Sequence, residues 1–524
     1  MAEAIEKLNI FSKENLIKTL VVLVVCAITG VLVNDQYKSV FLFLVGAMIF
    51  IGLSLAIFKK PYFGLFLVAF FLPFERLGSF EMGSMTVRIS QVFALITLIA
   101  FFLVSLAKKK NNYVKNPLII FVFLFTGVSV LSLANAQNIS RSLTILGFNF
   151  FVMLVALVIP SLINSKELFK KIVWVILLSG LVVSIYGLFQ FVGDMIGIPK
   201  EITGLRDIYT SQVFGFPRIQ GTSSEPLYFG NFLLIPLGIC LAMILSRKRG
   251  KQDEIDNGLI LGQETKKQKN NKTNRLLNLS APIVLFVILG LMVLNLVLTV
   301  SRGAYLGFAG MLVLFALFYF KSFFSPKRII IIAAIAIIAI VSTIYLLKFT
   351  RKDVNIKNFT AQATEFEEGA SIEERYSTYK QAWFLIQRNP ILGVGIGGFG
   401  PEVAQGPISI PKNGWAIVNN EFLEIWAETG IFGLLIFLAM IFFIFFRTLK
   451  VWFKSDDFMD KTLVVGLTVA FAGILIQYMT FSSLYIIHIW FLIGLIIAGQ
   501  NLALRKFQIP NSKQITKDKL QNRI

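Results

Sequence analysis

Residues 371–400 read SIEERYSTYKQAWFLIQRNPILGVGIGGFG, and residues 419–433 read NNEFLEIWAETGIFG. Charged residues, turns and glycines mark this region, whereas nearly all of the chain around it is long and apolar. Ser371 and Glu374 have the spacing of a capping box, and the Asn-Pro pair at 389–390 predicts where the helix ends. The apolar residues between them recur at helical spacing: Ile372, Tyr376, Tyr379, Trp383 and Ile386. We therefore predict an amphipathic helix, which lies on a membrane surface or over a cavity or, alternatively, only packs on the protein surface.

The composition places the chain among membrane proteins. Hydrophobic residues make up 56% of its 524 residues, and repeated apolar runs approach the ~20 residues that cross a bilayer. The net charge of +21 could indicate nucleic-acid binding, but the basic residues lie between apolar runs and therefore indicate orientation in a membrane. Because Cys26 and Cys240 both lie inside apolar runs, we expect neither a disulfide framework nor a thiolate metal site. No small-residue cleavage site follows the first run, which predicts a retained helix.

We predict an all-α, polytopic protein of about 14 transmembrane helices. The apolar runs lie at approximately 16–33, 40–58, 62–74, 89–107, 117–134, 142–163, 172–192, 226–245, 280–299, 303–320, 329–347, 421–446, 462–480 and 484–500. Every second connection is rich in Lys and Arg, which predicts that both termini are cytoplasmic.

The predicted organisation is a single transmembrane domain over residues 1–524. Its main connections are extracytoplasmic loops at 193–225 and 348–420, a basic, mobile cytoplasmic loop at 246–279 and a cytoplasmic tail at 501–524. The larger outer loop contains the amphipathic helix. A cysteine placed at residue 205 or 365 should then react with an impermeant thiol reagent in intact cells, and one at 265 should not.

Two arginines and a glutamate are expected at the outer mouth of the membrane domain. Arg218 and Glu225 precede a helix that Pro226 is suited to begin. In the short turn TVSRGAYLG, Ser301 is expected to cap the next helix, and Arg302 stands beside its free N–H groups. A guanidinium at a helix N-terminus makes an anion site. The alternative is an arginine that reaches the interface or binds a lipid phosphate.

Three carboxylates follow the amphipathic region. Glu421, Glu424 and Glu428 are spaced i, i+3 and i+7, so they share one helix face and should line an aqueous cavity. The alternative is that they pair with arginines to hold the fold. His488 is the sole histidine and lies within an apolar run, where a packed, hydrogen-bonded side chain is expected rather than a catalyst.

Nothing in the sequence predicts a bound cofactor. It has no Walker or Rossmann fingerprint, and no cluster on the predicted outer side has metal-ligand spacing. Arginines and glutamates without a metal suit a reaction whose leaving group is an anion already held in the membrane, such as a lipid pyrophosphate.

Four short motifs resemble those of the polytopic O-antigen polymerase and O-antigen ligase family, over about residues 210–445. They are R-x-x-G…E-P, T-x-S-R-G-A, R-x7-W…N-P-x-x-G-x-G-x-G-x-F and N-x-x-L-x4-E-x-G. Their residues here are Arg218, Gly221, Glu225, Pro226, Ser301, Arg302, Arg375, Trp383, Pro390, Gly393, Gly395, Phe399, Asn420, Leu423, Glu428 and Gly430. The resemblance implies transfer of a glycan from a polyprenyl-pyrophosphate donor to a sugar hydroxyl of a lipid-linked acceptor, at the outer face of the bacterial inner membrane. Ligases of this family usually have His where this chain has Asn419, which favours a polymerase.

The expected mechanism divides the site residues into two groups. The pyrophosphate-binding group is Arg218, Ser301, Arg302 and Arg375. The catalytic group is Glu225, Glu421, Glu424, Glu428 and Asn419. One glutamate would take the hydroxyl proton, and Asn419 would orient the acceptor hydroxyl or cap its helix. The alternatives are a ligase that attaches finished glycan to a lipid or protein acceptor, a lipid-linked oligosaccharide flippase, and a scaffold for other polysaccharide assembly proteins.

Overall fold

The computed structural model describes residues 35–77, 79–82, 85–107, 116–261, 272–320, 370–404, 415–455 and 457–504. Within them, eight helical stretches are long and apolar enough to cross a membrane. They lie in α5 (Ile89–Ala107), α6 with η1 (Leu118–Ser132 and Leu133–Asn135), α7 (Ile139–Leu162), α8 (Lys166–Met195), α11 (Pro226–Leu261), α19 (Glu421–Lys454), α20 with η3 (Phe458–Gln477 and Tyr478–Thr480) and α21 (Ile487–Leu504). Shorter apolar helices lie in α3 (Asp35–Lys59), α4 (Tyr62–Phe71), α12 (Lys272–Leu298) and α13 (Arg302–Phe318).

These helices confirm a multi-pass membrane protein. Every predicted apolar run coincides with one of them except 16–33 and 329–347, which lie outside the described residues. The number of spans, about fourteen, therefore stays a prediction. One boundary was wrong: α11 continues to Leu261 and α12 begins at Lys272, so both helices extend into the stretch predicted as a mobile loop.

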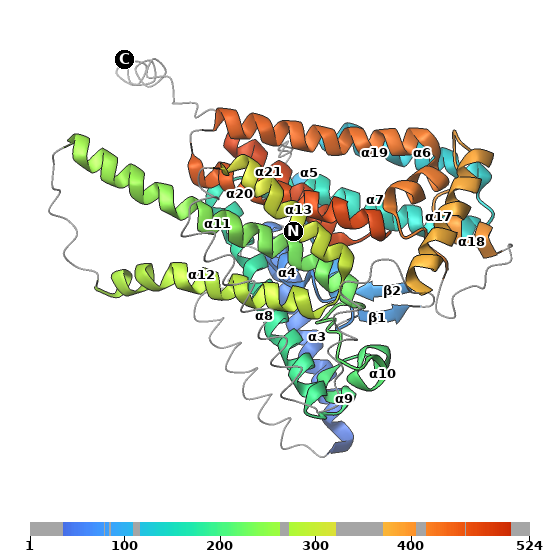
Figure 1. The fold of residues 1–524 in the computed structure, drawn as a ribbon, viewed down its shortest axis with the longest axis horizontal. Coiled ribbons are helices and arrows are strands. Elements are labelled where there is room, and N and C mark those ends of the chain that lie inside the picture. Colours follow the sequence, from blue (N-terminus) through green and yellow to red (C-terminus); the bar gives the residue numbers. More distant parts are fainter. Residues whose placement is uncertain are drawn as a thin grey trace.

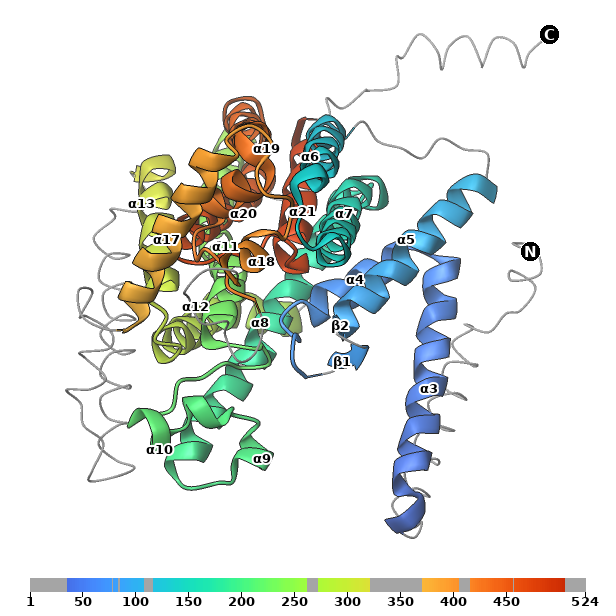
Figure 2. The same cartoon turned by 90° about the vertical axis from the view of Figure 1, so that its right-hand side faces the viewer.

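The core of the bundle is built around α20. It packs against α11, α13, α19 and α21, and α21 packs against α7 on its other side (Figures 1 and 2). The apolar windows of α11, α20 and α21 are 94%, 83% and 78% buried, whereas those of α6 and α19 are 28% and 33% buried and face outward. The α11–α20 contact is close because Gly238 and Gly466 face each other, and a Cβ on either would meet the other's carbonyl within 3 Å.

The polar elements gather at one end of this bundle. A hairpin of β1 (Ser79–Met82) and β2 (Met85–Arg88) lies there with α17 (Ala370–Arg388), α18 (Phe399–Ala404) and the start of α19, whereas the end of α11 and the start of α12 lie at the opposite end (Figure 1). The outer connection after α8 forms three short helices, α9 (Lys200–Thr203), η2 (Asp207–Tyr209) and α10 (Ser211–Phe214). Sequence reasoning treated the residues of the hairpin as a plain loop.

The amphipathic helix is α17, and its bounds agree with the prediction to within one residue. The side chains of Ser371 and Glu374 lie outside the described part, so the capping box stays a prediction. Two members of the predicted apolar stripe, Tyr376 and Trp383, are 62% and 48% exposed, so the stripe does not pack on the protein over its whole length. The face that packs on the protein consists of Thr378, Tyr379, Ala382, Leu385 and Ile386. Tyr379 is the one aromatic residue on this face, whereas Tyr376, Trp383 and Phe384 are exposed.

A break in α19 organises the polar end of the bundle. Gly430 has φ 69° and ψ −175°, a backbone conformation available essentially to glycine alone, so the helix is interrupted two residues after Glu428. The glycine-rich segment after α17 fills the gap: Val394 N–H and Gly395 N–H donate to the carbonyls of Ala427 and Glu428, at 2.9 and 3.0 Å. Ile431 N–H donates to Pro390 O at 2.9 Å. The backbone groups released by the break are therefore satisfied by the loop.

Gly430→Ala is expected to reduce the amount of folded protein sharply. The backbone conformation alone costs a non-glycine residue about 1–3 kcal/mol, and a Cβ would also lie 1.9 Å from Ile391 O. The measurement is the melting temperature of the detergent-solubilised protein, with Gly147→Ala as the control because a Cβ there meets no atom within 4 Å. A melting temperature for Gly430→Ala equal to that of the control would contradict this account of the break.

Candidate active site

A cluster of arginines surrounds Tyr209 at the outer end of the bundle. The guanidinium carbons of Arg206 and Arg218 each lie 5.7 Å from the centre of the Tyr209 ring. Arg218 N–H donates to Tyr209 O at 2.9 Å, and Arg206 Nη1 donates to Ser224 O at 3.2 Å. These contacts fold the outer loop back on itself and bring both arginines beside Glu225. Sequence reasoning selected Arg218 and Glu225 but missed Arg206 and Tyr209.

Arg218 also holds the turn that leads into α13. Its Nε donates to Thr299 O at 3.3 Å and its Nη2 donates to Val300 O at 3.2 Å. Val300 has φ 48°, a strained conformation for a β-branched residue, and Arg218 binds the carbonyls on both sides of this strain. Ser301 stands at the N-cap position of α13, but its side chain makes no capping hydrogen bond, so that prediction was wrong. Arg302 is the first residue of the helix and lies close enough to Arg218 to lower that residue's pKa.

The electrostatics of this cluster follow from its burial. Burial raises the pKa of the Glu225 carboxyl, and the charges of Arg206 and Arg218 offset part of that rise. Burial also lowers the pKa of Arg218 and raises the pKa of Tyr209 to about 12. Within the described residues, the Glu225 carboxylate accepts no hydrogen bond, so its oxygens are available to a bound molecule.

The three glutamates of α19 line one small cavity, as predicted. Its volume is about 40 Å³, and Arg141, Tyr485 and Thr429 also line it. Each carboxylate is already engaged by backbone N–H groups. Glu421 accepts from Ser483 at 2.5 Å, Glu424 from Val418 at 2.8 Å, and Glu428 from Gly397 and Phe399 at 2.8 and 3.2 Å. The glutamates thus fasten three separate loops to the start of α19.

Arg141 is a member of this cavity that sequence reasoning missed. Its Nε donates to Gly397 O at 2.9 Å, its guanidinium lies 5.4 Å from the Trp415 ring centre, and its charge acts on Glu424 and Glu428. Arg141 therefore supports in part the alternative in which the glutamates pair with an arginine. An arginine in the first turn of α7 was the available signal.

The structure gives the capping role predicted for Asn419 to its neighbour, Asn420. Asn420, not Asn419, caps α19, because its Oδ1 accepts from Phe422 N–H and Leu423 N–H at 3.1 and 3.2 Å. Asn419 instead adopts φ 60°, a left-handed conformation that asparagine tolerates better than most residues. Its carbonyl accepts from the Tyr379 hydroxyl at 3.2 Å. Arg375 lies one turn before Tyr379 on α17, and its charge acts on Tyr379.

Two further charged residues connect the arginine cluster with the glutamate cavity. Arg88 ends β2, and its charge acts on Glu75, Tyr228 and Tyr485. Tyr485 lines the cavity, and Glu75 interacts electrostatically with Glu225. The two sites therefore form one continuous polar region. The signal for Glu75 and Arg88 was their position at the ends of apolar runs.

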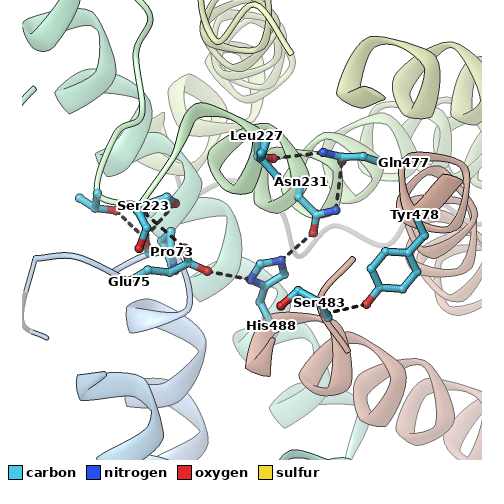
Figure 3. Close-up of polar contacts among 11 residues, drawn as sticks. Pro73, Glu75, Ser223, Leu227, Asn231, Gln477, Tyr478, Ser483 and His488 are labelled. Carbon is cyan, nitrogen blue, oxygen red and sulfur yellow. Dashed lines mark hydrogen bonds and ion pairs between the residues drawn. The ribbon is translucent and has the colours of Figure 1, made fainter. Parts of the chain in front are cut away.

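His488 is buried and hydrogen-bonded, which confirms the prediction of a packed side chain. Its Nε2 lies 2.8 Å from Asn231 Oδ1 (Figure 3). Among the residues that the structure describes, no group of three or more His, Cys, Asp or Glu side chains could hold a metal ion.

Comparison with models of known protein families matches residues 287–438 to the O-antigen ligase family. The matched segment runs from α12 into α19 and contains Arg302, Arg375 and all three glutamates of α19. Arg218, Glu225 and Glu75 lie before it. No curated protein matches the chain.

Proposed function

We propose that this protein is a polysaccharide polymerase that extends a lipid-linked glycan, and the match of residues 287–438 to the O-antigen ligase family supports this proposal. The donor would be a polyprenyl-pyrophosphate-linked oligosaccharide, and the acceptor a sugar hydroxyl of a second lipid-linked glycan. The product would be an O-antigen, capsule or exopolysaccharide. The reaction would take place at the outer face of the bacterial inner membrane, without a metal ion.

One observation carries this proposal. Arg206 and Arg218 lie beside a carboxylate, Glu225, whose oxygens accept no hydrogen bond from the described residues, and Arg218 also lies near Arg302 at the start of α13. The N–H groups at the start of α13 add to the positive potential there. Such a site can bind a pyrophosphate and, at the same time, take a proton from a neighbouring hydroxyl.

The proposed reaction is a displacement at the anomeric carbon of the donor sugar. The acceptor hydroxyl oxygen forms the new bond to that carbon, while the bond from the carbon to the pyrophosphate oxygen breaks. Arg302 binds the charge that develops on the leaving pyrophosphate, and Arg218 supports Arg302 by holding the strained turn. Arg375 closes over the headgroup from α17. The hydroxyl proton passes to a glutamate.

Glu225 is the glutamate that fits this role best. The carboxylates of Glu421, Glu424 and Glu428 are occupied by backbone N–H groups, and a base in that setting would have to give up hydrogen bonds that hold the loops. We assign to the α19 glutamates and Arg141 the shaping of the acceptor side of the region. Asn419, which has no basic nitrogen, orients an acceptor hydroxyl.

The second candidate function is a ligase, because the family model that matches the chain is that of O-antigen ligase. Asn419 favours the polymerase, since it stands where ligases usually have a histidine. Deletion followed by analysis of lipid-linked glycans separates these functions. Single repeat units stranded outside indicate a polymerase, and finished chains stranded outside indicate a ligase. Units stranded inside would indicate a flippase and overturn the proposal.

The proposed orientation predicts which sites an impermeant thiol reagent can reach. Leu205 lies at one of the positions predicted to react, but its side chain is buried, so a cysteine there would react poorly. Ile202 is 63% exposed in the same loop. In a background without Cys26 and Cys240, Ile202→Cys should be labelled in intact cells, and Thr265→Cys only after lysis. Labelling of Thr265→Cys in intact cells would invert the topology and move the site inside.

A further inference from the structure

A ring of polar contacts links Leu227 through His488 to Glu75 (Figure 3). It returns to Ser224, so its two ends flank Glu225 in the sequence. On one side, Leu227 O accepts from Gln477 Nε2 at 3.1 Å, Gln477 Oε1 accepts from Asn231 Nδ2 at 3.0 Å, and Asn231 Oδ1 contacts His488 Nε2 at 2.8 Å. His488 Nδ1 then lies 3.9 Å from a carboxylate oxygen of Glu75. The ring therefore ties a buried histidine to the start of the helix that follows Glu225.

The ring closes through the segment that precedes the β-hairpin. The second oxygen of Glu75 lies 3.5 Å from Ser224 N. The hydroxyl groups of Thr222 and Ser223 both donate to Pro73 O, at 2.7 and 3.4 Å. Because these contacts hold the residues immediately before Glu225, the position of Glu225 depends on Glu75.

The ring fixes the tautomer of His488. A backbone carbonyl can only accept, so the Gln477 atom beside Leu227 O must be its NH₂ group. Gln477 then presents its oxygen to Asn231, which must donate with its own NH₂ group and accept with Oδ1. His488 Nε2 must therefore carry a hydrogen. In the neutral imidazole Nδ1 is then a bare acceptor, and this buried atom has no hydrogen-bond partner among the described residues.

The atom that faces this acceptor belongs to Glu75. The side chains of Glu75 and His488 are 4% and 1% exposed, so both are shielded from bulk solvent. Burial raises the pKa of Glu75, and the charge of Glu225 raises it further, whereas Arg88 and Ser224 N–H lower it. Tyr228 is the other titratable group that faces the pair, from α11. Two neighbouring carboxyl groups at such a site ionise unequally.

We propose that Glu75 is a positioning residue that works in its protonated form, with its O–H directed at His488 Nδ1 3.9 Å away, and that Glu225 is the ionised member of the two carboxyl groups. The role of Glu225 in this inference rests on the proposed function. The assignment of the proton to Glu75 does not. The proton stays on Glu75, and no bond to it forms or breaks during transfer. A neutral Glu75 keeps a second negative charge away from Glu225 and holds the Ser224 backbone in place.

The protonation states can be measured without substrate. Because His488 is the only histidine, the purified protein labelled with ¹⁵N-histidine gives the nitrogen signals of this one ring. We expect a proton on Nε2 and none on Nδ1 at neutral pH. The infrared difference between wild type and Glu75→Gln should contain the carbonyl band of a protonated carboxylic acid. An imidazolium, an Nδ1–H tautomer, or absence of that band would each overturn the proposal.

The functional part is tested by glycan transfer with purified protein. Glu75→Gln keeps a donor for Nδ1 and should retain about half of the activity or more, whereas Glu75→Leu leaves that nitrogen unsatisfied and should retain about a tenth or less. Wild type should lose transfer at alkaline pH, and Glu75→Gln should not. Glu201→Gln is the matched control, because Glu201 is exposed and lies in the same connection as Glu225.

Loss of activity in Glu75→Gln would show that Glu75 works as a carboxylate and would overturn the positioning role. Full activity in Glu75→Leu would also overturn it. If wild type itself transfers no glycan, the proposed function fails, and the ¹⁵N and infrared measurements still decide the state of the pair.

Discussion

Arg302→Ala is expected to lower glycan transfer by about 100-fold or more, while the protein still inserts and accumulates normally. Arg302 begins α13, so its guanidinium and the helix N–H groups can act on the same anion. In the proposed reaction, the negative charge on the pyrophosphate grows as the bond to the sugar breaks. Loss of the guanidinium should therefore reduce the rate of transfer more than the binding of the donor.

Two further variants sharpen this test. Arg302→Lys should recover little activity, because an ammonium keeps the charge but loses the bidentate geometry that suits a phosphate. Arg388→Ala is the matched control, since Arg388 is an exposed arginine at the end of α17, away from the cluster. The measurement is conversion of a lipid-linked repeat unit to polymer by purified protein. Normal conversion by Arg302→Ala would remove Arg302 from the mechanism and support the interpretation that it binds a lipid phosphate.

Glu225→Gln should reduce polymerisation by about 100-fold or more, with little change in stability. Glutamine preserves the shape of the side chain and removes its basicity. The pH profile gives a second measurement. A base must be ionised, and burial raises the pKa of Glu225, so wild-type activity should fall on acidification at a higher pH than for an exposed glutamate. In Glu225→Gln this acid limb should be absent from any residual activity.

The glutamates of α19 provide the comparison. Glu421→Gln, Glu424→Gln and Glu428→Gln each weaken a charge-assisted hydrogen bond to a loop, so they should lower the melting temperature and retain measurable transfer. Near-zero transfer by one of these three, with normal transfer by Glu225→Gln, would move the base into the glutamate cavity. Normal transfer by all four would show that no glutamate base operates. Departure of the pyrophosphate would then drive the reaction alone.

The helices were predictable because the bilayer sets their length and composition. An apolar run of about 20 residues has few alternatives to a membrane helix, and α5, α7 and α20 follow their runs closely. The bounds of α17 were predictable from a cap and an Asn-Pro pair. Its inner face was not, since apolar spacing does not distinguish a face that meets lipid or solvent from one that meets protein. Ala382 packs inward, whereas Trp383 points outward.

The candidate site was only half predictable. Arg218, Glu225, Arg302 and the α19 glutamates were found from motifs, and the structure brings the first three together. Arg206, Arg141 and Glu75 belong to no motif, and their roles depend on contacts with residues far away in the sequence. Arg141, for example, donates to Gly397, 256 positions later. Such contacts depend on how the helices pack, which local sequence patterns do not specify.

The position of the break at Gly430 allows the length of the rest of α19 to be compared with the thickness of a bilayer. The unbroken part of α19 after it, Ile431–Lys454, is about 24 residues, or roughly 36 Å at ~1.5 Å per residue. That length already exceeds the ~30 Å of hydrocarbon in a bilayer. The first nine residues of α19, with Glu421, Glu424 and Glu428, are then not needed to span the hydrocarbon. In the proposed topology we therefore expect the carboxylates near the depth of a polyprenyl lipid headgroup.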